Sequence, residues 1–217
     1  LDEIISYQKS KMNDWTNYFS SGKLNFNVQS INKWLRAPHE AKYYNRTDFD
    51  TRGIDGNKRL AAIAQEYVDF ITKEIDLRKY QNIYILYPSK QNVIATDLVP
   101  RSTNFTLKEG NTVMSVFART NYDWKMQTPF WAFWIHELLH GIGIAGHAPG
   151  GNQGLPLGIM DSQMLGSRSI NVWEQFILGW LPESQTYCIT PEKIAGQVVS
   201  LSPMEREDSA TKGIFIP

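Results

Sequence analysis

The sequence predicts an α+β fold in a single domain of 217 residues. An amphipathic helical pattern covers Lys58 to Ile75, short runs rich in β-branched residues follow it, and an almost wholly apolar helix is expected from Phe130 to Ile142. A chain of this length buries a substantial core. No low-complexity tract or Pro/Ser-rich linker divides it, so residues 1–217 are expected to form one domain.

The charge and apolar patterns exclude two classes of partner. Lys+Arg and Asp+Glu both number 22, and this balance argues against a nucleic-acid binder, which needs a basic excess. The longest apolar run, Phe130 to Ile135, is far shorter than the roughly 20 residues of a membrane span.

Cys188 is the single cysteine, which rules out an internal disulfide and a thiolate zinc site. We expect its side chain to be buried, as free cysteines commonly are.

The N-terminal third gives few signals. From Leu1 to about Leu35 aromatic and polar residues mix without a clear period, and no element is predicted there. Tyr43 to Asn57 is rich in turn residues and resembles half of a calcium loop. However, Arg52 and Arg59 stand where an EF-hand places oxygen ligands. A surface loop is the expectation, and a calcium site of another design is the alternative.

A helix and several strands are predicted next. The helix from Lys58 to Ile75 carries one apolar stripe, made by Leu60, Ile63, Ala64, Tyr67, Ile71 and Ile75. Ile83 to Tyr87 is a short apolar run closed by Pro88, as in a buried strand. Val93 to Val99 and Thr112 to Ala118 are further strand candidates.

The apolar helix from Phe130 to Ile142 begins after a clear start signal. Thr128 is a suitable N-cap, and Pro129 suits the first helical position. Apolar residues occupy almost every side of this helix, which indicates that it is buried in a core.

His136, Glu137 and His140 interrupt this helix as the pattern H-E-x-x-H. Residues i and i+4 project from one helix face, about 5–6 Å apart at Cβ, so two imidazoles can bind one ion. Glu137 is rotated by about 100° from His136, where it can take a proton from a zinc-bound water whose pKa falls from about 15.7 to about 7. Two hydrogen-bonded core histidines are the structural alternative, but their burial beside a carboxylate is costly without a shared partner. The pattern therefore predicts zinc.

A third ligand must lie outside the helix, because a catalytic zinc normally has three protein ligands and one open position. Gly143 is placed to end the helix with positive φ and to turn the chain back. His147 follows that turn and is the expected third ligand. Asp161 and His39 are the alternatives.

These features resemble the metzincin superfamily of zinc peptidases, whose pattern is H-E-x-x-H-x-x-G-x-x-H followed by a Met-turn. Met160, within Gly158 to Asp161, stands where the Met-turn is expected. The third histidine comes one residue late here, with Gly146 in its usual place. Within the superfamily the chain is most similar to the immune inhibitor A-like bacterial peptidases, which often use an acidic third ligand. That similarity is carried by Val172 to Leu181, Val198 to Pro203 and Gly213 to Pro217.

The resemblance implies a metzincin-like zincin fold. Its upper part, about 1–143, would hold a twisted mixed sheet and the zinc helix. Its lower, irregular part, about 144–217, would hold the Met-turn and a helix near 171–179 that Gly179 ends. The substrate cleft would lie between the two parts.

The activity that the resemblance implies is that of a secreted zinc endopeptidase acting on proteins or peptides. Zinc would be held by His136, His140 and His147, with Glu137 as general base and later general acid. A zinc hydrolase of a non-peptide amide and a zinc-retaining binding module without turnover are the alternatives. A dinucleotide site at Gly141 to Gly146 is disfavoured, because that G-x-G-x-x-G follows a helix and not a strand.

At the C-terminal end, we expect Val198 to Leu201 and Ile214 to Ile216 to pair as strands on the lower part. The pairing is completed only at the last residue given, Pro217, so the native chain is expected to continue.

Overall fold

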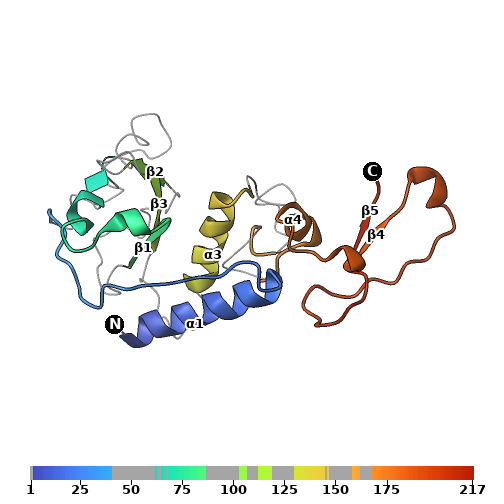
Figure 1. The fold of residues 1–217 in the computed structure, drawn as a ribbon, viewed down its shortest axis with the longest axis horizontal. Coiled ribbons are helices and arrows are strands. Elements are labelled where there is room, and N and C mark those ends of the chain that lie inside the picture. The colour runs from blue at the N-terminus through green and yellow to red at the C-terminus, as the bar shows by residue number, and fades with distance from the viewer. Residues whose placement is uncertain are drawn as a thin grey trace.

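The computed structural model describes residues 2–40, 62, 65–66, 68–86, 103–106, 112–118, 130–144, 146, 158–161 and 168–217. These residues form a three-stranded sheet with helices to one side of it and, further along the chain, a two-stranded sheet (Figure 1). The predicted loop at 43–57 and the predicted strand at 93–99 lie outside the described residues.

The first element is a long helix that was not predicted, α1 (Asp2–Phe19). Its buried face recurs at helical spacing and consists of Gln8, Met12, Trp15, Thr16 and Phe19. Two of these five residues are polar, which interrupts the apolar stripe from which a helix is recognised. The Thr16 hydroxyl is satisfied within the helix, because it donates to the carbonyl of Met12 at 2.8 Å.

The helix predicted at Lys58 to Ile75 is present at residues 62, 65–66 and 68–71. It ends earlier than predicted, because residues 72–74 form a turn after Ile71. Val68 is almost completely buried on it. A 3-10 turn, η3 (Leu77–Lys79), follows, and the Asp76 side chain caps it by accepting from the backbone N–H of Arg78.

The first sheet is mixed, with strand order β1-β3-β2. Strand β1 (Asn82–Leu86) runs parallel to β3 (Thr112–Ala118), and β2 (Thr103–Thr106) runs antiparallel to β3. β1 and β3 confirm the strands predicted at 83–87 and 112–118. β2 was not predicted, since its four residues are too few to show an alternating pattern.

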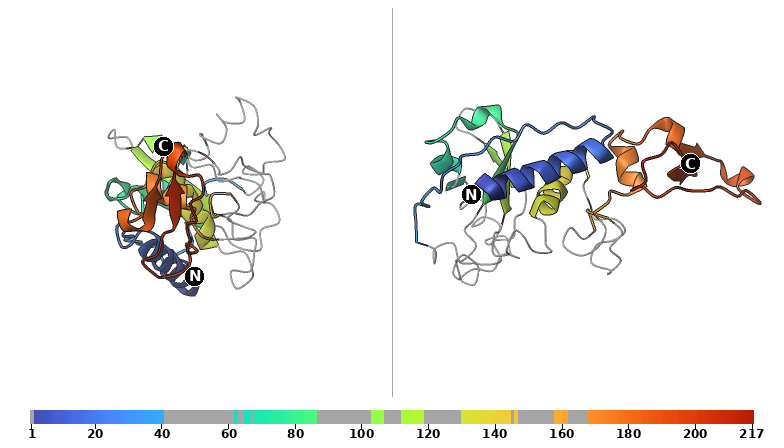
Figure 2. Two further views of the ribbon diagram at one scale, coloured as in Figure 1. Left: turned by 90° about the vertical axis from the view of Figure 1, so that its right-hand side faces the viewer. Right: turned by 90° about the horizontal axis from the view of Figure 1, so that it is seen from below.

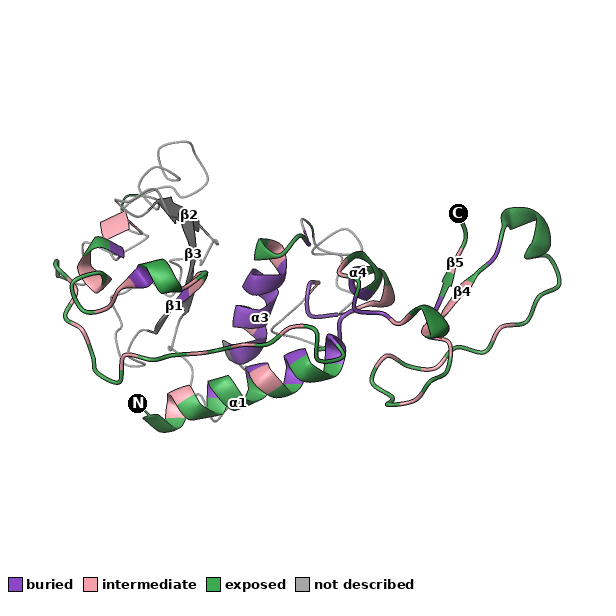
Figure 3. Cartoon of the chain, in the orientation of Figure 1, coloured by how far each residue is buried: buried purple, intermediate pink, exposed green. Residues whose placement is uncertain are grey.

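The main core lies between α1, α3 (Phe130–Gly141) and the segments at 158–161 and 168–180. Figure 3 shows α3 buried along most of its length, with α1 covering one side of it. Burial on every side confirms the prediction of a core helix. The core cluster includes Met12, Trp15, Phe19, Trp131, Ala132, Trp134, Ile135, Leu139, Ile144, Ile159, Met160, Ile170 and Trp180.

The C-terminal part begins with α4 (Val172–Ile177), close to the helix predicted near 171–179. Asn171 and Glu174 form a reciprocal capping box at its start. Gly179 follows its end with a φ of +66°, a conformation that favours glycine.

The last elements are the 3-10 turns η4 (Glu183–Gln185) and η5 (Pro191–Lys193) and the parallel strands β4 (Thr186–Cys188) and β5 (Gly213–Phe215). Figure 2 shows them reaching out from the rest of the molecule.

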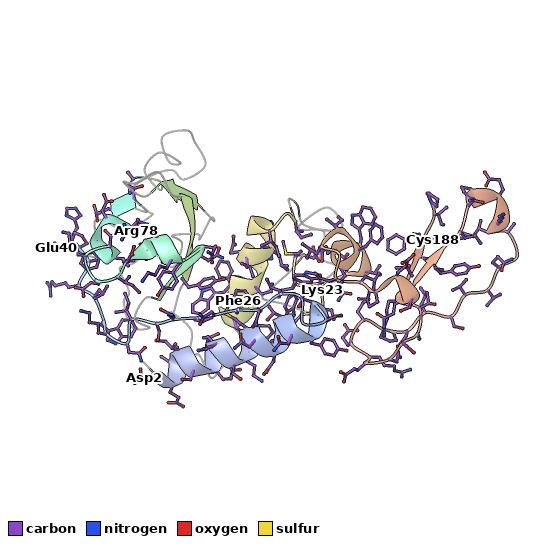
Figure 4. The ribbon with its side chains drawn as sticks, viewed as in Figure 1. Asp2, Lys23, Phe26, Glu40, Arg78 and Cys188 are labelled. Carbon is purple, nitrogen blue, oxygen red and sulfur yellow. The ribbon has the colours of Figure 1, made fainter. Side chains whose placement is uncertain are left out.

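Two predictions for this part are wrong. Val198 to Leu201 forms no strand, Val198 is 94% exposed, and β5 pairs with β4 instead. The pairing of β5 with β4 is explained by Phe215. The centroid of its ring lies 4.4 Å from that of Phe176 in α4, and this contact holds β5 beside the segment that leads into β4. Cys188 is exposed and not buried, because it lies on the open side of a two-stranded ribbon (Figure 4).

Candidate metal centre

The end of α3 is fixed by a Schellman motif. The N–H of Ile144 donates to the carbonyl of Leu139 at 2.9 Å, and the N–H of Gly143 donates to that of His140 at 3.4 Å. These are the two bonds of the motif, and Gly143 occupies its left-handed position with a φ of +124°. The helix stop predicted at this glycine is therefore confirmed, and it turns Ile144 back toward the helix.

The turn at Gly143 orients His140, and a second turn, at residues 158–161, orients His136. His140 Nδ1 lies 2.7 Å from the carbonyl oxygen of Ile144, and His136 Nδ1 lies 2.8 Å from that of Ile159. A carbonyl oxygen only accepts hydrogen bonds, so both Nδ1 atoms carry the proton. In the neutral form, such a ring presents an unprotonated Nε2, the form in which histidine binds a metal.

The two Nε2 atoms face each other at 3.2 Å, with the rings nearly perpendicular at 87°. Two lone pairs at this distance repel each other unless a proton or a metal cation lies between them. Two zinc–nitrogen bonds of about 2.0–2.1 Å in tetrahedral geometry hold their nitrogens about 3.3 Å apart. The donor atoms of His136 and His140 therefore fit zinc in both chemistry and spacing.

Glu137 lies on the same helix, between the histidine face and the face that meets β1. It is 7% exposed, and His136 is 4% exposed. Burial raises the pKa of the Tyr84 hydroxyl in β1, and the negative charge of Glu137 adds to that shift. The Tyr84 ring stacks on Trp134 of α3 with centroids 4.8 Å apart. A buried carboxylate thus stands one residue from the candidate ligand His136, with an aromatic wall beside it.

The segment at 158–161 forms a turn beneath the histidines. The N–H of Ile159 donates to the carbonyl of Ser169 at 2.7 Å, and that of Asp161 donates to Gly158 at 3.1 Å. Ile159 and Met160 are completely buried. A Cβ at Gly158 would meet the Ser169 oxygen at 3.1 Å, so glycine lets the two backbones approach closely. The methionine is thus in a buried turn whose backbone holds His136.

The remaining candidate ligands are placed differently. His147 lies outside the described residues. The ring of His39 forms an ion pair with Glu66 at 3.1 Å when protonated. Asp161 is partly exposed in the turn. Among the described residues no group of three His, Cys, Asp or Glu side chains is arranged to hold a metal, so neither His39 nor Asp161 joins the histidine pair there.

Three contributions to this site were not found from the sequence: the carbonyls of Ile144 and Ile159, and the ring of Tyr84. The contact of the Ile144 carbonyl with His140 could have been predicted, because the turn at Gly143 was expected and His140 lies only four residues before Ile144. The other two join segments 23 and 53 residues apart, and no local pattern signals such contacts.

Comparison of the chain with protein-family models, with curated proteins and with solved structures finds no match. In the described part of the chain, none of the helices has both the length and the apolar character needed to cross a membrane.

Proposed function

We propose that this chain is a zinc-dependent endopeptidase, with zinc held by His136, His140 and His147. The observation that carries the proposal is the histidine pair. Both Nδ1 atoms are bound to backbone carbonyls, and both Nε2 atoms face each other at 3.2 Å on a buried helix. Histidines that bind metals are typically oriented in this way through the ring nitrogen that does not bind.

Glu137 is the general base in this proposal. Zinc, when bound, supplies Lewis acidity and makes water a usable nucleophile at neutral pH. Glu137 accepts a proton from the attacking water and then delivers it to the leaving amine nitrogen. The backbone carbonyls of Ile144 and Ile159 keep the two imidazoles in one tautomer and one orientation.

The substrate class and the location of the protein rest on the resemblance to metzincins. Proteins or peptides are the proposed substrates, and the proposed location is extracellular. The mixed sheet, the core helix and the buried turn at Met160 are compatible with the metzincin-like arrangement.

The substitution Glu137→Gln tests the mechanism. We expect it to retain the fold and the zinc, because the carboxylate moves protons and does not bind the metal. Cleavage of casein should fall by at least about a hundredfold, the usual contribution of a general base. Circular dichroism, elemental analysis and a casein digest measure the three quantities. Glu183→Gln, at an exposed glutamate of η4, is the matched control and should keep full activity.

Three outcomes would count against the proposal. Undiminished cleavage by Glu137→Gln would refute the assigned base. A zinc-loaded wild-type protein that cleaves small amides but no peptide in a library would indicate a zinc hydrolase of non-peptide amides. A zinc-loaded protein inert on every substrate would indicate a binding module.

A further inference from the structure

A cavity of about 1270 Å³ lies on the other side of α3 from the histidines. It is lined by α1, by the extended segment 24–37, which we call the strap, and by β1. Trp134 and Leu138 of α3 and Ile142 directly after it also line the cavity, and they share one stripe at i, i+4 and i+8. His136 is rotated by about 200° from Trp134 around the helix axis, so the cavity and the proposed zinc site use opposite faces of α3.

The strap is extended and has an inner and an outer side. Leu24, Phe26 and Val28 are partly buried, whereas Asn25 and Asn27 between them are exposed. Figures 1 and 4 show the strap running from the end of α1 past Phe26 toward Glu40, without helix or strand. This alternation is that of a β-strand with one apolar side.

The main chain of the strap lacks the partners that a strand normally has. Within the described part of the chain, no backbone hydrogen bond joins residues 25–37 to another segment. Side chains hold the strap instead: Lys33 forms an ion pair with Glu74, and the hydroxyl of Tyr80 donates to Gln29. An extended segment with unpaired N–H and C=O groups is a template for another strand.

The wall opposite the strap offers two buried hydrogen-bond donors. The Nε1 of Trp134 and the hydroxyl of Tyr84 are buried and have no partner among the described residues. Trp134 is 6% exposed, and both side chains line the cavity. Buried donors are almost always satisfied in native proteins, and within the described part of the chain no acceptor oxygen meets these two.

Positive charge gathers among the residues that line the cavity. Lys9, Arg36 and Lys79 form no ion pair within the described part of the chain, and among the lining residues they outnumber the one carboxylate, Glu40. An occupant that carries acidic groups is therefore favoured electrostatically.

From these features we infer that the cavity binds an extended peptide segment with apolar and acidic residues alternating along it. Its main chain pairs with the strap, its apolar side chains face the interior, and a carbonyl oxygen accepts from Trp134 and Tyr84. Its acidic side chains face Lys9 and Arg36. This site does not depend on the proposed peptidase activity, because binding there needs neither zinc nor Glu137.

The binding test uses the 217-residue chain with Glu137→Gln, so that no cleavage interferes. The probe is an acetylated, fluorescein-labelled heptapeptide that alternates valine with glutamate, followed by fluorescence anisotropy. We expect saturable one-to-one binding that weakens as salt is raised. A peptide with lysine in place of glutamate, and one with alternate amides N-methylated, should each bind at least about tenfold more weakly.

Two sets of variants locate the site. Trp134→Phe with Tyr84→Phe removes both donors and leaves an aromatic ring at each position. Val28→Pro removes one N–H of the strap, whose backbone makes no bond to another segment in the described part of the chain. Each should weaken peptide binding at least about tenfold. Trp173→Phe with Tyr18→Phe changes the same residue types outside the cavity and should leave binding unchanged.

The inference is overturned if the folded protein does not bind the acidic peptide, or if both cavity variants bind it as tightly as their parent. If the Trp134 and Tyr84 variant fails to fold, Val28→Pro decides the question alone. Palmitate is tested as a competitor: binding of palmitate without binding of the peptide would assign the cavity to a lipid and refute the peptide site.

Discussion

At the scale of single residues, His136 and His140 are oriented by the backbone and not by other side chains. Each Nδ1 donates to a carbonyl that a turn places within 2.8 Å. A turn is stiffer than a long side chain, so the two rings are held in one orientation before any ion arrives. Such preorganisation lowers the entropic cost of binding.

The third ligand gives a prediction at this scale. We expect His147→Ala to lower zinc occupancy and to abolish peptidase activity, because two histidines alone leave a catalytic zinc one protein ligand short. His39→Ala and Asp161→Asn should retain zinc, since neither residue joins the histidine pair in the described structure. Elemental analysis after dialysis measures zinc in all three variants.

The controls make this result specific. His39→Ala removes a histidine that is already engaged with Glu66, so it reports any general effect of losing an imidazole. Full zinc loading of the His147→Ala protein would contradict the assignment and would point to an acidic third ligand, such as Asp161.

At the scale of elements, the C-terminal stop of α3 is as important for the site as the helix itself. Gly143 has a φ of +124°, which a residue with a Cβ adopts only with strain, although there is open space around it. We expect Gly143→Ala to destabilise the fold by about 1–3 kcal/mol and to weaken zinc binding. The reason is that Ile144 would no longer present its carbonyl to His140.

Urea unfolding and zinc titration measure these two effects. Gly146→Ala is the matched control, because Gly146 also has open space around it but no positive φ. Equal stability and equal zinc affinity of the two variants would show that the turn at Gly143 does not support the site.

The elements themselves differ in how far the sequence predicts them. β1, β3 and α3 have strong local patterns, and the structure confirms all three. α1 was missed because Gln8 and Thr16 stand on its buried face. Its helical state is stabilised by packing against α3, so tertiary contacts outweighed a weak local signal.

At the scale of the whole molecule, the C-terminal part depends on polar contacts more than on a core. Residues 186–217 are largely exposed, as Figure 3 shows. Lys212 is an exception, with a side chain only 4% exposed. Its Nζ donates to the carbonyls of Pro203 and Arg206 at 2.8 and 2.7 Å and to Asp208 at 2.9 Å. This buried ammonium group therefore closes the loop between residues 202 and 212.

Asp208 makes this contact sensitive to pH. The hydrogen bonds from Lys212 and then Ser202 lower the pKa of Asp208 from its ordinary 3.8 to about 2. A lowered pKa in the folded state contributes stability above the ordinary value, and this contribution is lost as the pH falls through about 2. We expect Lys212→Met to return the pKa of Asp208 toward 3.8 and to reduce the loss of stability between pH 4 and pH 2.

NMR titration of the aspartate side chains measures these pKa values, and urea unfolding at each pH measures stability. Asp76 is an internal control, because its pKa of about 2 is set mainly by hydrogen bonds from Arg78 and should not change. A pKa of Asp208 that stays near 2 in Lys212→Met would refute the role of the lysine.

The sequence by itself determined those features whose causes are local. The spacing of His136 and His140 places both on one helix face, the apolar surroundings bury that helix, and Gly143 ends it. All three depend on residues within one or two turns of each other, and helical geometry is the same in any protein.

Only the tertiary structure decided which distant segments meet. It placed the Ile159 carbonyl against His136, the Tyr84 ring near Glu137, and β5 beside β4 in place of the predicted pairing with 198–201. It also formed the cavity between α1, the strap and α3. Such contacts depend on how apolar faces from different parts of the chain pack together, and many pairings of those faces satisfy the local patterns equally well.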